Sequence, residues 1–191
     1  MTDIPEKQIR AIYDDQTIRV YQAYSHPIAD AALAKGTFTS PPFKMDRMTW
    51  IKPSFLWMMY RAGWGHKDEG QNRILAIDIT RDGFEWALQH SCASRSEADM
   101  SKEDWEQLKA RSPVRIQWDP ERNLHLQPLA HRAIQIGVSG AAVPLYVNEW
   151  IRRITDVTPL AHRIGSLVAD GKLDEAQALL PLERAYPAPI A

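Results

Sequence analysis

Pro53 divides residues 47–61, RMTWIKPSFLWMMYR, into two parts with different backbone geometry. The residue before a proline is disfavoured in helical geometry, so residues 48–52 are predicted to be extended. Proline is tolerated in the first turn of a helix, and the residues that follow are apolar on every side. A buried helix is therefore predicted to begin at Pro53 and to end at Gly63. The chain must contain a strand-to-helix junction at this point.

Hydrophobic periodicity and turn residues predict the other elements of the chain. Strands are predicted at residues 18–24, 73–80, 114–118, 124–126 and 132–136. Helices are predicted at residues 26–35, 82–88, 101–112, 147–154, 160–168 and 173–180, with Ser25, Asp82 and Ser101 as N-caps. Loops are predicted at residues 36–46 and 91–100, and a hairpin turn at residues 119–123.

This mixture of strands and helices predicts the α+β fold class, with small mixed or antiparallel sheets, a buried helix and a C-terminal helical segment. We find no internal repeat and no linker between domains. We therefore expect a single domain over residues 1–191, with its core at about residues 8–180 and an extended tail at residues 181–191.

The composition sets the expected environment of the protein. The chain has 191 residues, 45% of them hydrophobic, which is enough for one core. Its only cysteine is Cys92, so an intrachain disulfide is excluded. The first residues lack the pattern of a signal peptide, and no apolar run is long enough to span a membrane, so we expect a cytoplasmic protein without membrane contact. Six histidines without HxH or HExxH spacing give no reason to expect a metal.

A local excess of positive charge surrounds the strand-to-helix junction. The formal net charge is -1, but residues 44–81 contain seven basic and four acidic residues. A helix begins with free backbone N–H groups and a positive dipole end, which favours an anion. We therefore predict that Arg47, Thr49, Lys52 and Ser54 bind a phosphate-bearing small molecule. In the alternative interpretation Lys52 and Ser54 only cap a buried helix, and Arg47 and Arg61 stack on nearby tryptophans.

Five motifs resemble one uncharacterised family. They are RAIYD at residues 10–14, VYQAY at 20–24, RMTWIKPSF at 47–55, QWDPER at 117–122 and QIG at 135–137. Together they resemble the family named domain of unknown function 4291, over about residues 8–186. The resemblance implies family membership without implying an activity.

The order of the predicted elements in the first 80 residues is similar to the front half of ADP-ribosyltransferase-like folds. Those enzymes bind NAD between two small sheets, so the resemblance implies NAD as a cofactor. Their first strand supplies an Arg or His to NAD, where this chain has Gln22 or Tyr21. Their second motif supplies Ser or Thr, here Thr49 or Ser54. The resemblance also implies a ligand contact from Tyr24.

The third motif of those enzymes places a catalytic Glu on a later strand. This chain offers only Gln135 at that place, or Glu149 on a helix, as catalytic candidates. Without a carboxylate to orient the attacking group, ADP-ribosyl or glycosyl transfer and NAD hydrolysis would be weakened. The sequence thus leaves an NAD-using enzyme and binding without turnover both open.

Two further hypotheses belong to other functional classes. The tryptophan-rich basic segment would also suit a non-catalytic module that binds nucleic acid or a protein partner. Asp119 and Glu121 form a carboxylate pair that would suit a phosphodiesterase, although a hairpin turn explains the same residues. The sequence specifies neither a substrate nor an oligomeric state.

Overall fold

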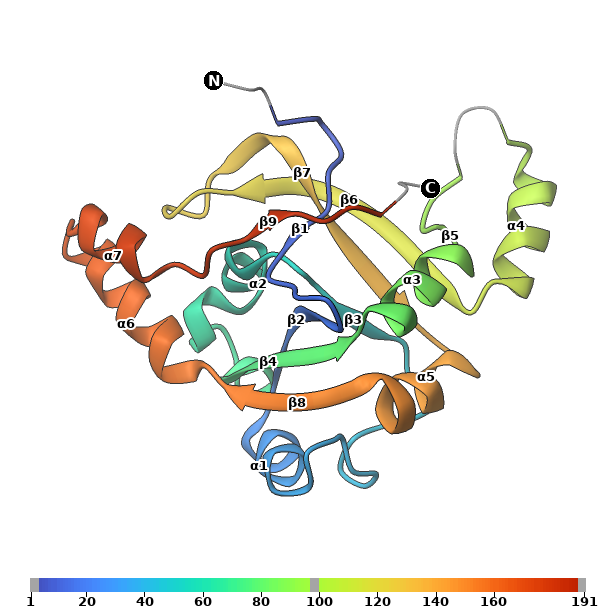
Figure 1. Cartoon of the computed structure of the whole chain (residues 1–191), viewed down its shortest axis with the longest axis horizontal. Coiled ribbons are helices and arrows are strands. Elements are labelled where there is room, and N and C mark those ends of the chain that lie inside the picture. Colours follow the sequence, from blue (N-terminus) through green and yellow to red (C-terminus); the bar gives the residue numbers. More distant parts are fainter. Residues whose placement is uncertain (1–3, 97–99, 189–191) are drawn as a thin grey trace.

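The computed structural model describes residues 4–96 and 100–188 and has an α+β architecture (Figure 1). The strands are β1 (Arg10–Ala11), β2 (Thr17–Tyr24), β3 (Thr49–Ile51), β4 (Arg73–Thr80), β5 (Ser91–Ala93), β6 (Val114–Arg122), β7 (Pro128–Val138), β8 (Ile151–Asp156) and β9 (Arg184–Ala185). The helices are α1 (His26–Lys35), α2 (Phe55–Ala62), α3 (Arg81–Gln89), α4 (Lys102–Arg111), α5 (Ala142–Leu145), α6 (Thr158–Ala169) and α7 (Leu173–Leu179). Two 3-10 turns, η1 (Gly63–Gly65) and η2 (Glu69–Gln71), and a π-helical turn, η3 (Tyr146–Trp150), complete the chain.

The first sheet has the order β2-β4-β8, with each pair antiparallel. Strands β2 and β4 confirm the predictions for residues 18–24 and 73–80. Six of the eight residues of β4 are buried, as its central place between two strands requires. The Asp78 carboxylate ties the sheet together, because Arg19 from β2 donates to one of its oxygens at 2.8 Å and Arg153 from β8 to the other at 3.0 Å.

The predicted helix at residues 147–154 is wrong, because the chain leaves a π-helical turn at Trp150 and enters β8. In the register of β8, Ile151 pairs with Ile79 and Ile154 with Ile77, so a β-bulge places an extra residue between them. The bulge lets two residues three apart lie on one face of a strand. The same spacing in the sequence is typical of a helix, which explains the error.

The second sheet has the order β3-β7-β6-β5, in which only the short pair β5 and β6 is parallel. The predicted hairpin turn at residues 119–123 is wrong, because β6 continues through Pro120 to Arg122. Strand β5 covers only the start of β6, so Pro120 lies on an open edge where its missing N–H is tolerated. The chain turns instead between Asn123 and β7, and the predicted strand at residues 124–126 is part of this turn.

Strand β5 also corrects the loop predicted at residues 91–100, of which residues 97–99 lie outside the described residues. Helix α1 has the predicted bounds, although Ser25 makes no capping hydrogen bond with its side chain there. In α3, Thr80 takes the capping place that was predicted for Asp82, and its hydroxyl accepts from the Gly83 N–H.

Helix α2 starts at the predicted junction and is buried on most of its surface. The Ser54 hydroxyl caps it by accepting from the Trp57 N–H at 3.0 Å, and Gly63 ends it in left-handed geometry. The prediction of burial on every side is corrected at two positions, since Tyr60 and Arg61 are exposed. One turn of this helix therefore reaches the surface.

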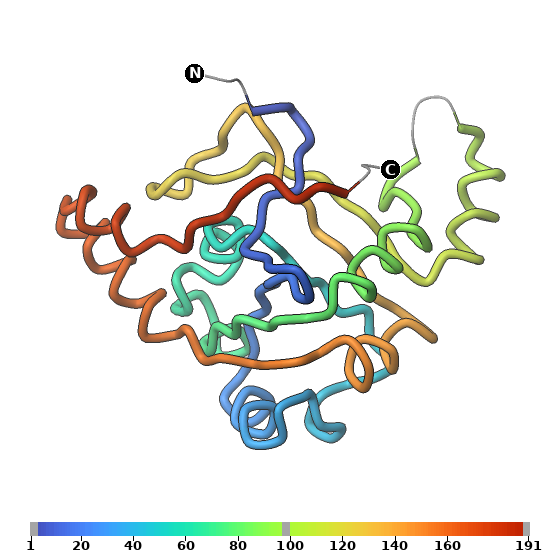
Figure 2. Tube along the Cα trace, in the orientation of Figure 1, coloured from blue at the N-terminus to red at the C-terminus, as the bar shows by residue number. Residues whose placement is uncertain are grey.

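The C-terminal segment returns across the molecule to the N-terminal one. Helices α6 and α7 lie where helices were predicted, and β9 then pairs antiparallel with β1. The two segments run side by side in the Cα trace (Figure 2). Residues 189–191 of the predicted tail lie outside the described residues. None of the described helices combines the length and the apolar character that crossing a membrane demands.

Gly83 allows α3 to pack closely against the aromatic core. A Cβ atom at Gly83 would lie 2.4 Å from Cγ of Trp150, whose indole is buried. We predict that Gly83→Ala lowers the free energy of unfolding by about 1–3 kcal/mol, because overpacking outweighs the gain in helix propensity. Urea denaturation measures this difference. The exposed Gln89→Ala on the same helix should be neutral, and a stabilised Gly83→Ala would contradict the prediction.

Candidate functional site

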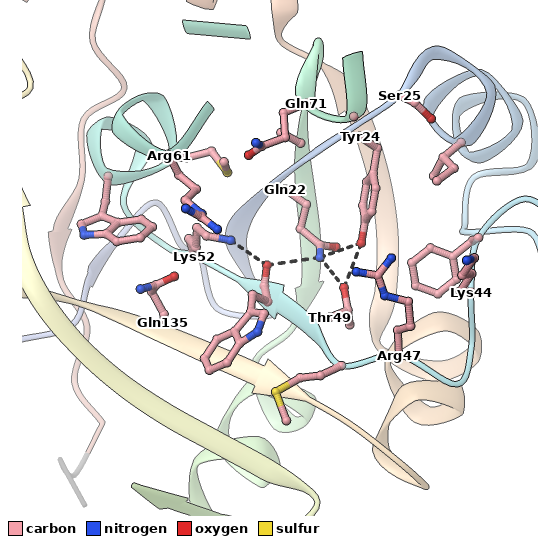
Figure 3. Close-up of a pocket in the computed structure, with 18 of the residues that line it drawn as sticks. Gln22, Tyr24, Ser25, Lys44, Arg47, Thr49, Lys52, Arg61, Gln71 and Gln135 are labelled. Atoms are coloured by element: carbon pink, nitrogen blue, oxygen red, sulfur yellow. Dashed lines mark hydrogen bonds between the residues drawn. The ribbon is translucent and has the colours of Figure 1, made fainter. Parts of the chain in front are cut away.

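A cavity of about 770 Å³ lies where the two sheets meet (Figure 3). Strand β2 of the first sheet forms one wall, and β3, β6 and β7 of the second sheet form others. Helix α2, the loop around Phe43, the start of α1 and the turn η2 also contribute to the lining. This arrangement brings Gln22, Thr49 and Gln135 into one cavity, although 113 residues separate the first from the last.

The Gln22 side chain is the centre of a buried hydrogen-bond network. Its amide nitrogen donates to the Thr49 hydroxyl, to the Tyr24 hydroxyl at 3.1 Å and to the Trp50 carbonyl at 3.2 Å. Its oxygen accepts from the Tyr146 hydroxyl at 2.6 Å. Because every polar atom of this amide has a partner, its orientation is fixed before any ligand binds.

This network leaves one hydroxyl proton for a ligand. The Tyr24 and Thr49 hydroxyl oxygens lie 2.9 Å apart, and either can donate to the other. Whichever donates, the proton of the other hydroxyl has no acceptor within the network. Burial raises the pKa of Tyr24 to about 12, so this hydroxyl keeps its proton at neutral pH. The cavity therefore offers a fixed hydrogen-bond donor.

Lys52 is an ammonium group placed in the wall of the cavity. Its side chain is almost fully enclosed, with 7% exposure, and its Nζ donates to the Trp50 carbonyl at 3.0 Å. Burial and, second, the nearby Arg61 guanidinium lower the pKa of Lys52 to about 7. At neutral pH the neutral and charged forms of this amine are both populated.

The charged side chains in the lining of the cavity are all basic. They are Lys44, Arg47, Lys52 and Arg61. Figure 3 places Lys52 and Arg61 on one side of the Gln22 amide and Lys44 and Arg47 on the other. Over residues 4–96 and 100–188, none of these four is in an ion pair, and no carboxylate lines the cavity. Unpaired positive charge of this kind attracts an anionic ligand.

Gln135 lines the cavity together with Gln117, its cross-strand neighbour on β6. Both amides donate to the Asp119 carboxylate, which is not part of the lining. Asp119 thus orients two glutamines whose other polar atoms remain available to a ligand. The place that the resemblance assigns to a catalytic Glu holds an amide, which cannot act as a general base.

Ser54 lies outside the cavity, contrary to the expectation that it lines a pocket with Lys52. Its hydroxyl donates to Glu121 at 2.8 Å and caps α2. The N–H of Phe55 is also occupied, since it donates to the Glu183 carboxylate at 2.7 Å. The N-terminus of α2 therefore faces internal carboxylates, and the cations on the other side of the junction line the cavity.

Those two carboxylates are partly buried beside the helix end. Burial raises the pKa of Glu121, and burial together with the charge of Glu121 raises the pKa of Glu183 to about 8. Glu183 comes from the C-terminal segment, 128 residues beyond Phe55. No sequence signal pointed to this contact, since Glu183 belongs to the predicted tail.

The other catalytic candidates do not join the cavity. Glu149 is exposed in the π-helical turn and does not contact the lining. Asp119 and Glu121 lie on one strand but bond to different groups, the glutamine amides and Ser54 respectively. Within the described part of the chain, no cluster of three or more His, Cys, Asp or Glu side chains is arranged to hold a metal.

Three residues of the site were missed by sequence reasoning: Lys44, Arg61 and Gln117. Lys44 and Arg61 belong to the excess of basic residues at residues 44–81, and this excess is the sequence signal that could have identified them as site residues. Gln117 belongs to the motif QWDPER, which was interpreted as the approach to a turn. Its direction into the cavity follows from the strand pairing with Gln135, which alternation alone did not show.

A comparison with protein-family models matches residues 8–186 to one described as a domain of unknown function, DUF4291. A search of curated proteins found no match to the chain.

Lys52→Met tests whether the buried amine destabilises the empty site. Methionine keeps the apolar stem, and the Trp50 carbonyl still accepts from Gln22. Because the pKa of Lys52 is lowered to about 7 in the folded state, folding opposes its protonation. The resulting loss of stability is complete below pH 7 and disappears as the pH rises towards 10.5. We predict that Lys52→Met raises the melting temperature, and more at pH 6 than at pH 9.5. The exposed Lys102→Met should show no such difference, and equal shifts of Lys52→Met at both pH values would contradict the argument.

Glu183→Gln tests the carboxyl group at the end of α2. The raised pKa means that protonated Glu183 stabilises the fold below about pH 4.5, and that this contribution is lost as the pH rises through 8. Glutamine still accepts from the Phe55 N–H but does not titrate. We predict that the wild type loses stability relative to Glu183→Gln between pH 5 and pH 8.5, as measured by urea denaturation. Asp174→Asn, on the exposed face of α7, is the control, and parallel curves for Glu183→Gln would refute the prediction.

Proposed function

We propose that this chain, which belongs to the DUF4291 family, binds a phosphate-bearing nucleotide in the cavity, with NAD as the candidate ligand. The observation that carries the proposal is the charge of the lining, in which four basic side chains meet no carboxylate among the described residues. A volume of about 770 Å³ is within the range of small-molecule sites.

Each part of the cavity has a role in this proposal. Arg61 and Lys52 on one side of the Gln22 amide, and Arg47 on the other, give phosphate oxygens two places to bind. The hydroxyl pair of Tyr24 and Thr49 donates to a neutral oxygen of the ligand, such as a ribose hydroxyl. Aromatic side chains in the lining offer a surface for a base.

The choice of NAD rests on the resemblance to ADP-ribosyltransferase-like folds. The resemblance assigns Gln22 and Thr49 to NAD contacts and Gln135 to the place of the catalytic Glu, and these three residues line one cavity between two sheets. Transfer of ADP-ribose or hydrolysis of NAD is the reaction class that the resemblance implies. An amide at position 135 supplies no base, so binding without turnover is part of the same proposal.

A nucleic-acid strand is the second candidate ligand, favoured by the exposure of Lys44, Arg47 and Arg61 at the cavity. Phosphates of a strand would contact these exposed groups, and the observed affinity would fall steeply with salt. A small nucleotide brings only about two or three phosphates to the cavity, so its affinity falls less steeply with salt than that of a strand with many phosphate contacts. A salt titration of binding to a single-stranded oligonucleotide therefore separates the two candidates.

Arg61→Ala tests the proposed phosphate contact. We predict that NAD raises the melting temperature of the wild type and that Arg61→Ala weakens NAD binding about tenfold to a hundredfold, because one charge-assisted hydrogen bond is lost. Calorimetric titration measures the affinity, and release of nicotinamide measures turnover. Lys102→Ala on α4, outside the cavity, is the matched control. If NAD and ADP-ribose leave the melting temperature unchanged, the proposal for NAD fails.

A further inference from the structure

The surroundings of the Lys52 side chain favour a role as an amine nucleophile over a role as a phosphate contact alone. Its side chain is enclosed, it lines the cavity, and its Nζ makes one hydrogen bond, to the Trp50 carbonyl at 3.0 Å. Lys52 has no ion-pair partner among the described residues. The charged group that acts on its pKa is the cationic Arg61, which lowers it. Enclosure without a counter-ion favours the neutral amine, whose lone pair is the reactive form.

We propose that Lys52 forms an imine with the aldehyde of a sugar phosphate bound in the cavity. The inference rests on the proposed function in one respect, that the cavity holds the phosphate of its ligand. It adds the chemical class of the ligand, a phosphorylated sugar with a free aldehyde in its open-chain form, and a covalent step at Lys52.

The hydrogen-bond network places an acid near this amine. The Trp50 carbonyl oxygen accepts from both Lys52 Nζ and Gln22 Nε2, so the amine lies next to the Gln22 amide. That amide holds the Tyr24 and Thr49 hydroxyls, one of which keeps a proton without an acceptor in the network. Figure 3 shows this chain of contacts from Lys52 to Tyr24. A general acid is what addition to a carbonyl requires.

The step balances without a co-reactant other than water. The Nζ lone pair forms the C–N bond, the carbonyl oxygen takes a proton from the hydroxyl pair, and the proton that the nitrogen releases passes through water back to that pair. The hydroxyl group of the resulting carbinolamine then takes one proton from the solvent and leaves as water, while the nitrogen lone pair forms the C=N bond. One amine, one aldehyde and one proton give one iminium ion and one water.

The charges of the lining select the ligand. Arg47 lies on the far side of the Gln22 amide from Lys52, where it would hold a phosphate at one end of the ligand while the amine reacts with the aldehyde at the other. No described carboxylate of the lining would repel a phosphate or pair with the lysine. A short sugar phosphate such as ribose 5-phosphate has its aldehyde and its phosphate at opposite ends, as these positions require.

Reductive trapping tests the proposal on the full chain. The wild type is incubated with ribose 5-phosphate and sodium cyanoborohydride at pH 7, followed by intact-mass and peptide mass spectrometry. We expect a single adduct at Lys52, with the mass of the sugar phosphate less one oxygen, before other lysines react. Lys52→Met should lose this adduct, and Lys102→Met should keep it. Because peptide mapping of the wild type locates the adduct, the result does not depend on the folding of a variant.

The pH profile of trapping is a second readout. The groups that face Lys52 are Arg61 from α2 and the network of Tyr24 and Thr49, and the pKa of Lys52 is lowered to about 7. The rate of labelling at Lys52 should rise to about pH 7 and then level off. Labelling at the exposed Lys102 should be slower at pH 7.

The possible results separate this inference from the proposed function. Ribitol 5-phosphate, which has no aldehyde, measures binding alone. If it raises the melting temperature and ribose 5-phosphate still leaves Lys52 unmodified, the imine is overturned while phosphate binding stands. Equal labelling of all lysines overturns it as well. If neither the sugar phosphates nor NAD stabilise the protein, the proposed function is wrong, and the imine, which rests on it, is overturned with it.

Discussion

The buried amide of Gln22 is the interaction on which the arrangement of the site depends. It sits on β2 of one sheet and bonds to Thr49 and to the Trp50 carbonyl on β3 of the other. Tyr146, from the π-helical turn, satisfies its oxygen. A buried amide left without these partners would carry the full cost of its desolvation, about 1–3 kcal/mol for each lost partner. This side chain and the backbone hydrogen bond from the Tyr21 N–H to the Lys52 carbonyl, at 2.8 Å, join the two sheets beside the cavity.

The strand-to-helix junction then separates the charges of the molecule. Lys52 ends the extended segment and points its amine into the cavity, while Pro53 redirects the chain so that α2 begins on the other side. There the helix end meets Glu183 and, through Ser54, Glu121. This turn of the backbone thus leaves carboxyl groups at the helix N-terminus and Lys52 in the cavity, which Arg61 lines from the last turn of α2. The positive charge of the cavity comes from side chains and not from the helix dipole.

Local sequence patterns predicted the parts of the fold and site that depend on neighbouring residues. The strand at residues 73–80, helix α1 and the junction at Pro53 follow from periodicity and proline geometry, and all are present. Gln22, Thr49 and Gln135 were also named from the sequence as candidate site residues, and the three line one cavity; that they bind a ligand stays a prediction. The errors arose where contacts between residues far apart in the sequence determine the secondary structure. A bulge against Ile79 gave β8 a helical spacing, and the turn predicted at Pro120 is a strand because β7 pairs with it.

Burial of Lys52 sets the stability of the fold against the local chemistry of the cavity. A lysine held at 7% exposure without a counter-ion among the described residues lowers stability, and a methionine or leucine would fill the same space without that cost. Departures from the rules of a stable core are expected where a side chain has a function. The residues around Lys52 reinforce the conflict, because Arg61 adds a second positive charge and Asp119 is kept out of the lining behind Gln117 and Gln135. An anionic ligand of the kind proposed above would offset these positive charges, and its binding would then stabilise the folded protein.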